Sequence, residues 1–369
     1  MNNDLICFSH LRWDFVYQRP QHLLSRFSKE SRIFYFEEPI LNADKAYLEI
    51  KKIPDSSIWI IVPHIKKDLS EKDYYFQQQL LLDNLISDHQ INNYILWYYS
   101  PMAICFSSHL QPVLIVYDCM DELSAFRFAP PSLIKNEELL FDKANIVFTG
   151  GYNLYHSKKQ KHAKVFPMPS SIDKEHFAVA RKLLTEPVDQ KDIPHPRLGF
   201  YGVIDERMDL ELVNLLAEKC PNFSIILLGP VVKINPNILP IKKNIYYLGG
   251  KKYNELPSYL SGWDIAIMPF AINESTEYIS PTKTPEYLAG GKPVISTPIK
   301  DVIDPYGNLS LVSIEVDADG FCDKAKIILA NDDKMQWLND VDKYLADISW
   351  DKTWKSMKVL MEECLAHNE

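Results

Sequence analysis

Glycine is scarce in this sequence, with 12 residues in a chain of 369. Phosphate-binding loops of the Gly-x-Gly-x-x-Gly and Gly-x-x-x-x-Gly-Lys kinds need several glycines close together, so that the backbone can approach the phosphate. The low glycine content therefore argues against such a loop. A phosphate bound by this chain is expected to be held by helix ends and by side chains.

Metal-ligand spacing, a signal peptide and a long apolar run are lacking as well. No Cys-x-x-Cys pair and no histidine cluster occurs, which argues against a zinc site and a disulfide framework. The N-terminus has no basic region, and no stretch approaches the roughly 18 apolar residues of a membrane span. We expect a cytoplasmic protein with reduced thiols and no metal. The six cysteines are Cys7, Cys105, Cys119, Cys220, Cys322 and Cys364.

An excess of basic residues is also absent, because 40 Lys and Arg stand against 49 Asp and Glu, a net charge of −9. Dedicated nucleic-acid binders are usually basic, so this class is disfavoured. The first half of the chain does hold basic clusters at Lys51–Lys52, Lys66–Lys67 and Lys158–His162. These predict either a peripheral contact with anionic lipid at the inner face of a membrane or ordinary solvated helix faces.

The sequence does contain short apolar runs that alternate with helix-length segments, and this alternation occurs twice. Val113–Tyr117 and Ile225–Leu228 are continuously apolar, as is typical of buried parallel strands. Such alternation predicts an α/β protein of two Rossmann-like, doubly wound parallel-sheet domains. The expected strands are Leu5–Ser9, Arg32–Glu37, Ser57–Val62, Asn93–Tyr99, Val113–Asp118, Asn145–Thr149, Lys164–Met168, Arg197–Val203, Phe223–Leu228, Asn244–Leu248, Asp264–Phe270, Pro293–Thr297 and Leu309–Ile314.

A polar, proline-containing stretch without apolar periodicity, residues 179–196, separates the two sets of strands and is predicted to be the linker. The first domain is then residues 1–178 and the second is residues 197–345. A helical tail, residues 346–369, carries Trp350 and Trp354 four positions apart. Ligand is expected in a cleft where the carboxyl ends of both sets of strands converge.

The run from Ser280 to Thr297 contains a complete helix signature. Ser280 is a suitable N-cap, Pro281 suits the first helical position, and Gly290-Gly291 can end the helix. Amides at the helix start together with Lys283 would bind an anion. Glu286, one turn further on, suits a ribose diol, although Pro285 implies a distorted first turn. The alternative is a helix that is merely well capped.

This run, preceded by Asp264–Phe270, resembles the donor-binding signature of GT-B glycosyltransferases of the family 1/family 4 type. Leu198–Arg207 resembles the first strand and turn of their donor domain, and Tyr247–Pro257 the strand and loop that hold the base. Pro169–Phe177 resembles the end of their acceptor domain. Trp350 and Trp354 match the tail helix that crosses back to the first domain in this fold. The resemblance covers nearly the whole chain and implies a bacterial, nucleotide-sugar-dependent hexosyltransferase.

The resemblance implies that Glu286 binds the ribose hydroxyls of a nucleotide sugar. Lys283 and Arg207, with the amides of Thr282 and Lys283, would hold the diphosphate, and fixed cations would replace a metal ion. No cofactor is expected besides the nucleotide-diphosphate sugar, which is the donor substrate. The base would meet the backbone of Tyr247, Leu248 and Gly249.

One position departs from the pattern of the family. Retaining members often carry Glu-x₇-Glu, and counting back from Glu286 places Tyr278 where the first Glu would stand. Glu277 and Glu274 are the nearest carboxylates. Either one replaces the usual Glu, or both are exposed loop charges and the transfer is inverting.

The loop after the first strand is dense in polar and aromatic residues, and it resembles the W-D-x-x-x-Q-R-P-Q-H opening of bacterial glycosyltransferases of this group. Such a loop lies where an α/β sheet binds ligand. The alternative is that its arginine pairs internally and its tryptophan packs under the loop. The residues expected to contact donor phosphate or acceptor are Arg12, Trp13, Asp14, Gln18 and Arg19.

An inverting transfer needs a base that deprotonates the acceptor hydroxyl. Asp118 and Asp121 follow an apolar strand and are the candidates in the first domain, with Asp121 preferred. Either aspartate could instead cap the next helix.

Three functions are open on this basis. The first is a glycosyltransferase that acts on a glycan or lipid-linked acceptor in the synthesis of a surface polysaccharide or glycoconjugate. The second is a non-catalytic nucleotide-sugar-binding partner subunit. The third is a nucleotide-sugar 2-epimerase on the same fold, which would need acidic and histidine groups around the sugar in both halves, and we find no matching histidine.

Overall fold

The computed structural model describes residues 3–182, 185–331 and 333–366. The chain forms two α/β units. The first consists of Met1–Pro169 with Asp351–Glu369, and the second of Ser170–Trp350. Each unit has its own sheet.

The first unit is built on a parallel sheet that is buried on both faces. Its order is β3-β5-β2-β1-β6-β7-β8-β9, and β4 pairs antiparallel with β5. Every residue of β2 and β6 is buried, because helices cover both faces, and this explains the continuous apolar runs. The strands are β1 Asp4–Ser9, β2 Ile33–Glu37, β3 Ile40–Leu41, β4 Tyr47–Lys52, β5 Ile58–Ile65, β6 Tyr94–Tyr98, β7 Leu114–Cys119, β8 Ile146–Thr149 and β9 Val165–Pro167.

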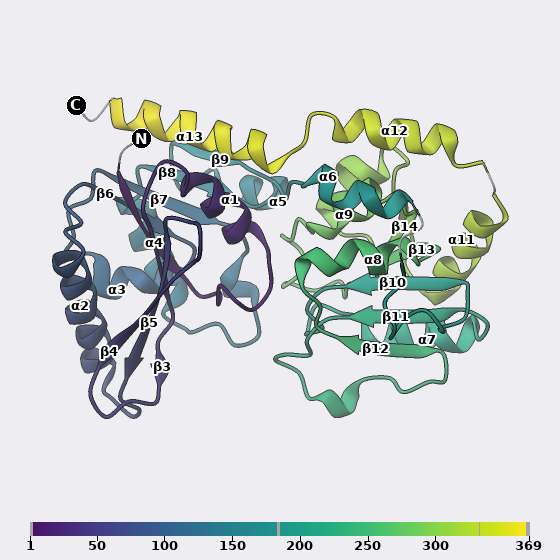
Figure 1. Ribbon diagram of the computed structural model, residues 1–369, viewed down its shortest axis with the longest axis horizontal. Coiled ribbons are helices and arrows are strands. Elements are labelled where there is room, and N and C mark those ends of the chain that lie inside the picture. The colour runs from purple at the N-terminus through teal and green to yellow at the C-terminus, as the bar shows by residue number, and fades with distance from the viewer. Residues whose placement is uncertain (1–2, 183–184, 332, 367–369) are drawn as a thin grey trace. The chain divides into compact units, whose positions relative to one another are not determined.

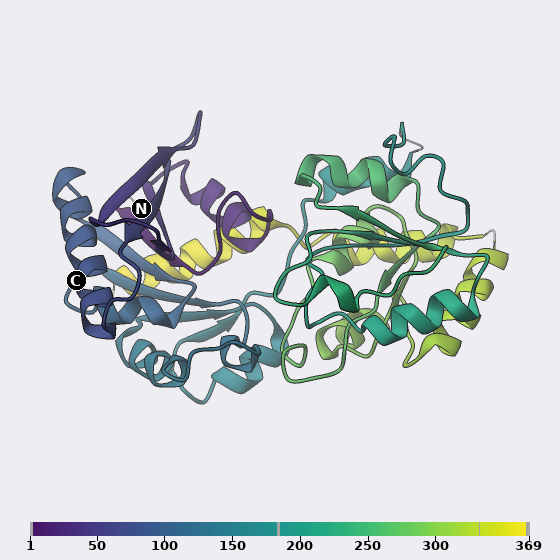
Figure 2. The ribbon, with the colours of Figure 1, turned by 90° about the horizontal axis from the view of Figure 1, so that it is seen from below.

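Helix α13 (Trp350–Ala366) brings the end of the chain onto the first unit, where it lies beside α1 (Figure 2). The rings of Phe27 and Trp354 meet edge to face at 6.1 Å, and Arg26 pairs with Asp351 at 2.7 Å. The other helices of this unit are α1 Arg19–Phe27, α2 Glu71–Asp88, α3 Ile104–Ser107, α4 Leu133–Lys143 and α5 Tyr152–Lys158, with short turns η1 Pro101–Ala103 and η2 Leu123–Ala125.

The second unit has a wholly parallel sheet of order β12-β11-β10-β13-β14-β15. Its helices cover both faces (Figures 1 and 2). Helices α7 and α11 contact each other, and α9 contacts α6 and α12. The strands are β10 Arg197–Tyr201, β11 Ser224–Leu228, β12 Ile245–Gly249, β13 Ile265–Met268, β14 Val294–Ser296 and β15 Ser313–Ile314. The helices are α6 Lys174–Ala178, α7 Leu210–Lys219, α8 Leu256–Ser261, α9 Lys283–Ala289, α10 Lys300–Val302, α11 Ala318–Ala330 and α12 Met335–Leu345.

The predicted architecture of two parallel-sheet α/β domains is confirmed. Each expected strand overlaps an observed one. Strands β3 and β4 were not predicted, because they are largely exposed and lack a continuous apolar run. They form the edge of the first sheet, where β4 extends β5 through antiparallel pairing.

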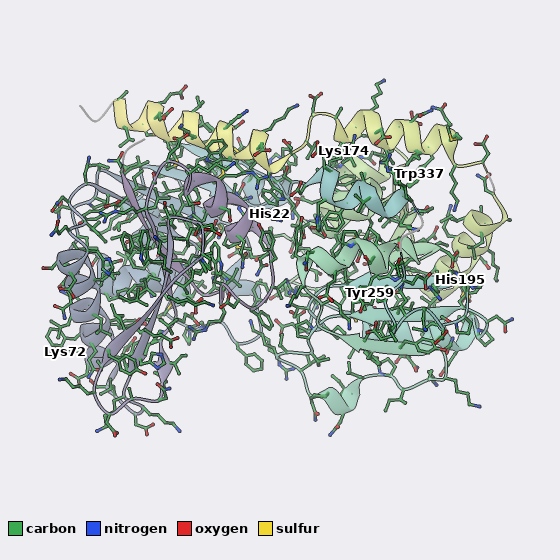
Figure 3. All side chains as sticks on the ribbon, in the orientation of Figure 1. His22, Lys72, Lys174, His195, Tyr259 and Trp337 are labelled. Carbon is green, nitrogen blue, oxygen red and sulfur yellow. A yellow bond between two sulfur atoms is a disulfide. The ribbon has the colours of Figure 1, made fainter. Side chains whose placement is uncertain are left out.

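The stretch predicted as a linker is packed into the second unit. Gln190 is fully buried, donates to the carbonyl of Tyr259 and accepts from Nε1 of Trp263. His195 contacts Asp264 at 2.7 Å; His195 and Tyr259 are labelled in Figure 3. The division lies instead after Pro169, because polar residues in this stretch bond to the second unit. Leu183 and Leu184 of the predicted linker lie outside the described residues.

Two cysteines correct the expectation of reduced thiols throughout. Cys220, at the end of α7, and Cys322, in α11, form a disulfide with an S–S distance of 2.09 Å. They are 102 positions apart, so the packing of α7 against α11 brings them together and no local spacing reveals it. In the part of the chain that the structure describes, no helix is long and apolar enough to cross a membrane.

Candidate active site

The loops that follow β10 and β13 are joined at the carboxyl ends of these strands. The amide of Ala271 donates to the carbonyl of Arg207 at 2.8 Å, and the amide of Asp209 donates to Pro269 at 2.9 Å. Adjacent parallel strands end at the same edge of a sheet, so this edge is where a doubly wound sheet presents its ligand-binding loops. Arg207 is therefore held next to Phe270.

Helix α9 begins later than the sequence predicted. Its first residue is Lys283 and its N-cap is Thr282, so Ser280 and Pro281 lie in the preceding turn. Pro285 is then the third residue of the helix, where the amide has no intrahelical partner, and its missing N–H costs no helical hydrogen bond. The distortion predicted at Pro285 is therefore not required. Gly291, at φ +71°, makes the predicted left-handed turn after the helix.

Lys283 points to the same edge of the sheet. Its Nζ lies 5.6 Å from the ring centre of Phe200 and 5.9 Å from that of Phe270. Gly202 (φ +145°), which follows β10, allows this approach, because a Cβ there would lie 2.2 Å from Cε of Lys283. The sequence therefore needs glycine at this one position to seat the lysine.

We expect Gly202→Ala to lower the affinity for a nucleoside diphosphate by about 1–3 kcal/mol, since the new Cβ displaces Lys283 and one charged hydrogen bond is lost. Titration calorimetry measures this. Lys283→Met should show a similar loss. The control is Gly291→Ala, which also places an alanine at positive φ but does not touch Lys283. Equal losses in Gly202→Ala and Gly291→Ala would contradict the role of Lys283.

Glu286 is buried on the first turn of α9, with 6% of its surface exposed. The hydroxyl of Tyr201 donates to Glu286 Oε2 at 2.7 Å, and the Tyr201 amide donates to the hydroxyl of Tyr287 at 2.9 Å. Burial raises the pKa of Glu286 to about 7, against the lowering effect of the Tyr201 hydrogen bond and of Lys283. Tyr201 was not predicted as a site residue, although its place at the end of β10, directly before Gly202, was the available signal.

Arg207 is half-buried and partly neutralised. Its Nη2 lies 2.7 Å from Asp205 Oδ2, and its Nε donates to the same carboxylate. This pair orients the guanidinium at the end of the β10 loop. The residues predicted to contact the diphosphate, Arg207, Thr282 and Lys283, thus all lie in segments that follow β10 and β13, at the same edge of the second sheet.

The predicted base-binding strand ends at that edge too. Gly249, at the end of β12, is exposed, and a Cβ there would meet no atom within 4 Å. Its carbonyl accepts from the Gly229 amide at 2.9 Å, and the Tyr247 hydroxyl donates to the Pro240 carbonyl. Leu248 is half-buried. The space directly beside Gly249 is open. The base-binding role of this strand end stays a prediction.

Glu274 and Glu277 lie in the loop between β13 and α9. Glu274 is exposed, and Glu277 pairs with Lys300 at 2.7 Å. Neither carboxylate is buried, whereas Glu286 is buried and accepts a hydrogen bond from Tyr201. Their predicted role as a substitute for the first Glu of the family pattern stays a prediction.

In the first unit, Glu37 organises the loop that follows β1. Its Oε1 accepts from the Trp13 amide at 2.7 Å, and its Oε2 pairs with Arg12 at 2.8 Å. Trp13 packs edge-on against Tyr35, with ring centres 5.0 Å apart. Asp14 is exposed and pairs with Lys51.

Two glutamines join the same loop to α1. The Gln18 amide donates to Gln21 Oε1, and Gln21 Nε2 donates to the carbonyls of Trp13 and Val16. The loop is thus rigidly held. Contacts of Arg12, Trp13, Asp14 and Gln18 with substrate stay predictions.

Arg19 and Asp118 are corrected by the structure. Arg19 is 4% exposed and Asp118 is fully buried. Arg19 Nη2 lies 2.8 Å from Asp118 Oδ1, Nε donates to both carboxylate oxygens, and Nη1 donates to the carbonyl of Met168. The internal pairing is therefore observed, and it withholds Arg19 from substrate and Asp118 from an acceptor hydroxyl. Burial raises the pKa of Asp118, although the nearby Arg19 charge lowers it.

Asp121 is half-buried in the segment that follows β7. Its neighbour Glu122 is anchored to Lys158 at 2.7 Å, and Lys158 also pairs with Glu137 at 2.7 Å. Lys158 is 2% exposed, so it does not belong to the solvated basic cluster that the sequence suggested. The anchored Glu122 fixes the backbone next to Asp121.

Within residues 3–182, 185–331 and 333–366, no group of three or more His, Cys, Asp or Glu side chains could hold a metal ion. Metal independence of the reaction stays a prediction.

Comparison with known proteins gives one sequence relative that bears on function. "Putative teichuronic acid biosynthesis glycosyltransferase TuaH" of Bacillus subtilis (strain 168) is 26% identical over 225 residues, which cover 55% of this chain and 55% of that protein. The chain thus matches about half the length of this curated relative. No family model matches the chain.

Solved structures match over nearly the whole chain. Sucrose-phosphate synthase from Thermosynechococcus elongatus has a TM-score of 0.73 at 12% identity, covering 99% of this chain and 100% of that one. Alr3699/HepE of Anabaena, in complex with UDP and glucose, has 0.67 at 12%, covering 98% and 99%. The fold is GT-B. The resemblance drawn from the run Ser280–Thr297 is thereby confirmed.

Proposed function

We propose that this chain is a glycosyltransferase that moves a sugar from a nucleotide-diphosphate sugar to a glycan or lipid-linked acceptor in surface polysaccharide synthesis. The observation that carries the proposal is the buried Glu286, which lies with Lys283 at the carboxyl ends of β10 and β13 in a GT-B donor unit. The name of the Bacillus subtilis relative and the UDP bound by the Anabaena neighbour support it.

The second unit provides the donor site. We assign Glu286 to the ribose hydroxyls, since an ionised carboxylate accepts hydrogen bonds from a diol. Lys283 and Arg207 bind the diphosphate and stabilise the charge that develops on it as the glycosidic bond breaks. The backbone at Gly249 meets the base. The reaction then needs no metal ion.

The first unit provides the acceptor side, with Asp121 as the base of an inverting transfer. The acceptor oxygen bonds to the anomeric carbon of the sugar, the bond from that carbon to the diphosphate breaks, and the hydroxyl proton passes to Asp121. Glu274 and Glu277 are the residues that would serve a retaining route instead.

We place the protein in the cytoplasm, with a peripheral contact to anionic lipid through the basic clusters of the first unit, chiefly Lys158–His162. Lys158 is buried and takes no part, so the exposed Lys159 and Lys161 carry this contact. Each would contribute about 1 kcal/mol near an anionic surface.

Binding of nucleoside diphosphates and nucleotide sugars tests the donor site directly. A thermal-shift screen over UDP-, GDP- and TDP-sugars should raise the melting temperature for at least one donor, because a ligand that binds the folded state stabilises it. Absence of binding to every nucleoside diphosphate by calorimetry would refute the proposal. Binding without turnover on any acceptor would favour the non-catalytic partner subunit.

Glu286→Ala should weaken nucleotide binding by about 1–3 kcal/mol through the loss of charged hydrogen bonds. In the wild type, affinity should also depend on pH, since ribose binding needs the ionised carboxylate. With a pKa of about 7, affinity should be roughly tenfold lower at pH 6 than at pH 8. Calorimetry at both pH values measures this, with the exposed Glu211→Ala as a control of the same charge change.

The stability of the protein without nucleotide should depend on pH with the opposite sign to the affinity. The pKa of Glu286 is raised from 4.5 to about 7, so the folded chain binds more protons than the unfolded chain between these values. The free energy of unfolding should therefore fall as the pH rises through this window. Glu286→Gln should remove this pH dependence of the free energy of unfolding. If the variant showed the same pH profiles of nucleotide affinity and of stability as the wild type, the ribose assignment would be contradicted.

A further inference from the structure

The two carboxylate oxygens of Glu286 have different surroundings. Oε2 accepts a hydrogen bond from the hydroxyl of Tyr201 at 2.7 Å, inside the fold. Within the residues that the structure describes, no group donates a hydrogen bond to Oε1, and Oε1 is not one of the buried side-chain atoms that lack a partner. The small exposed part of Glu286 therefore includes Oε1. One oxygen is fixed from within, and the other is open to a ligand.

The ring of Tyr201 is packed among aromatic side chains. The ring centres of Tyr287, Trp263 and Phe177 lie 4.7, 5.8 and 6.3 Å from that of Tyr201. The Tyr201 amide donates to the hydroxyl of Tyr287 at 2.9 Å, which ties the end of β10 to the residue after Glu286. Close packing leaves such a ring one position. The place of the hydroxyl that Glu286 accepts is therefore fixed by both the ring and the backbone of Tyr201.

The Tyr201 hydroxyl also favours the ionised form of Glu286. A hydrogen bond donated to a carboxylate stabilises its charge and lowers its pKa. At Glu286 this bond and the charge of Lys283 oppose burial, which raises the pKa to about 7. Burial and the nearby Glu286 charge raise the pKa of Tyr201 well above its ordinary value, so its hydroxyl keeps its proton and stays a donor.

We propose that Tyr201 is a positioning residue of the donor site, which holds Oε2 of Glu286 so that Oε1 of the carboxylate accepts the ribose hydroxyls. The inference rests on the proposed function and assigns a further residue to ribose recognition, one that acts through Glu286. Without the Tyr201 hydroxyl, the buried carboxylate turns toward another donor or takes up a proton. In either case the ribose loses an acceptor.

Other titratable groups lie on the elements around Glu286, and they bear on any test that varies pH. Of these groups, only His176 ordinarily changes its charge near neutral pH. It is present in the wild type and in every variant below, so its titration contributes equally to each. The groups are Lys283 and Tyr287 of α9, Tyr253 of η5 (Tyr253–Glu255), His176 of α6, which stacks on Tyr253, and Asp342 of α12, which pairs with Arg181 and Lys174.

Tyr201→Phe tests the proposal, because it keeps the packed ring and removes only the hydroxyl. Calorimetry measures affinity between about pH 5.5 and 9 for UDP-glucose or GDP-mannose, whichever stabilises the wild type more. The wild-type affinity should rise with pH around a midpoint near 7. In Tyr201→Phe the midpoint should lie about one pH unit higher, since a hydrogen bond to the charged form is lost. The loss of affinity should thus be several-fold at pH 7 and smaller at pH 9.

The matched control is Tyr287→Phe. It also removes a fully buried hydroxyl next to the site, but this hydroxyl bonds to the backbone of Tyr201 and not to the carboxylate of Glu286. Its midpoint should equal that of the wild type. An unchanged midpoint in Tyr201→Phe, with affinity lowered equally at every pH, would show a merely structural role and overturn the proposal. An equal shift in Tyr287→Phe would overturn it as well.

A double variant tests the same point if Tyr201→Phe alone does not fold. Glu286→Ala removes the carboxylate, so Tyr201 then has nothing to position. Adding Tyr201→Phe to Glu286→Ala should change the affinity less than about twofold, because the two residues act through one contact. A larger further loss would show that Tyr201 acts independently of Glu286 and would overturn the proposal.

Binding to the wild type separates the two possible failures. If neither nucleotide sugar binds, and neither UDP nor GDP binds, the proposed function fails and the inference fails with it. If the wild type binds its donor with a midpoint near 7 and Tyr201→Phe keeps that midpoint, only the assignment of Tyr201 fails.

Discussion

Replacing Asp121 by Asn should lower the rate of sugar transfer by about 10²–10⁴-fold, which is the usual contribution of a general base. The amide cannot take the proton of the acceptor hydroxyl, whereas Glu122 and Lys158 still hold the segment in place. Affinity for the donor should stay unchanged, because Asp121 belongs to the first unit and the nucleotide-binding residues belong to the second. Steady-state transfer kinetics and calorimetry on the same samples measure both quantities.

The outcome at Asp121 also decides the stereochemical route. If more than about a tenth of the activity survives, Asp121 is not the base, and Glu274→Gln and Glu277→Gln become the next variants. A product that retains its anomeric configuration would then indicate the retaining route, and an inverted product would indicate another base. Glu138→Gln, on the exposed face of α4, is the control for a local change of charge in the first unit.

Replacing Arg19 by Met should destabilise the first unit by about 3–5 kcal/mol, since it leaves the fully buried Asp118 without its partner. Chemical denaturation measures the change. The loss should shrink as the pH falls, because the pKa of Asp118 is already raised by burial and rises further without Arg19. A protonated Asp118 carries no charge that needs a partner.

A double variant distinguishes this structural role from substrate binding. Arg19→Met with Asp118→Leu removes both charges and should recover much of the stability, as apolar replacement of a buried pair often does. Donor affinity should be near the wild-type value in the double variant. A stable Arg19→Met protein with weak donor binding would instead restore Arg19 to the substrate site that the sequence suggested.

The strands could be predicted from the sequence because the sheets are parallel. A strand covered on both faces must be apolar at every position, so Val113–Tyr117 and Ile225–Leu228 are recognisable without any knowledge of their neighbours. The exposed edge strands β3 and β4 have no such requirement, and they were missed. The capped segment around α9 was found for a similar local reason, although its first residue is Lys283 and not Pro281.

The stretch 179–196 shows where local composition misleads. Its polar residues and prolines are typical of a linker, yet Gln190 is fully buried through hydrogen bonds to residues about 70 positions away. The Cys220–Cys322 disulfide is a second case, since its partners are brought together by two helices. Neither contact has a signature in the neighbouring sequence.

The paired sets of apolar runs were sufficient to predict a two-domain α/β chain, which the structure confirms. The scarcity of glycine and the Lys283–Glu286 spacing predicted a phosphate site made of a helix end and side chains, and that site stays a prediction. Only the tertiary structure decided which charges are paired inside the fold. Arg19 and Asp118 looked like site residues and are bonded to each other across 99 positions, while Lys158 looked solvated and is buried between two glutamates. Secondary structure follows from periodicity within a few residues, whereas the partner of a charge depends on which strand ends the fold brings together.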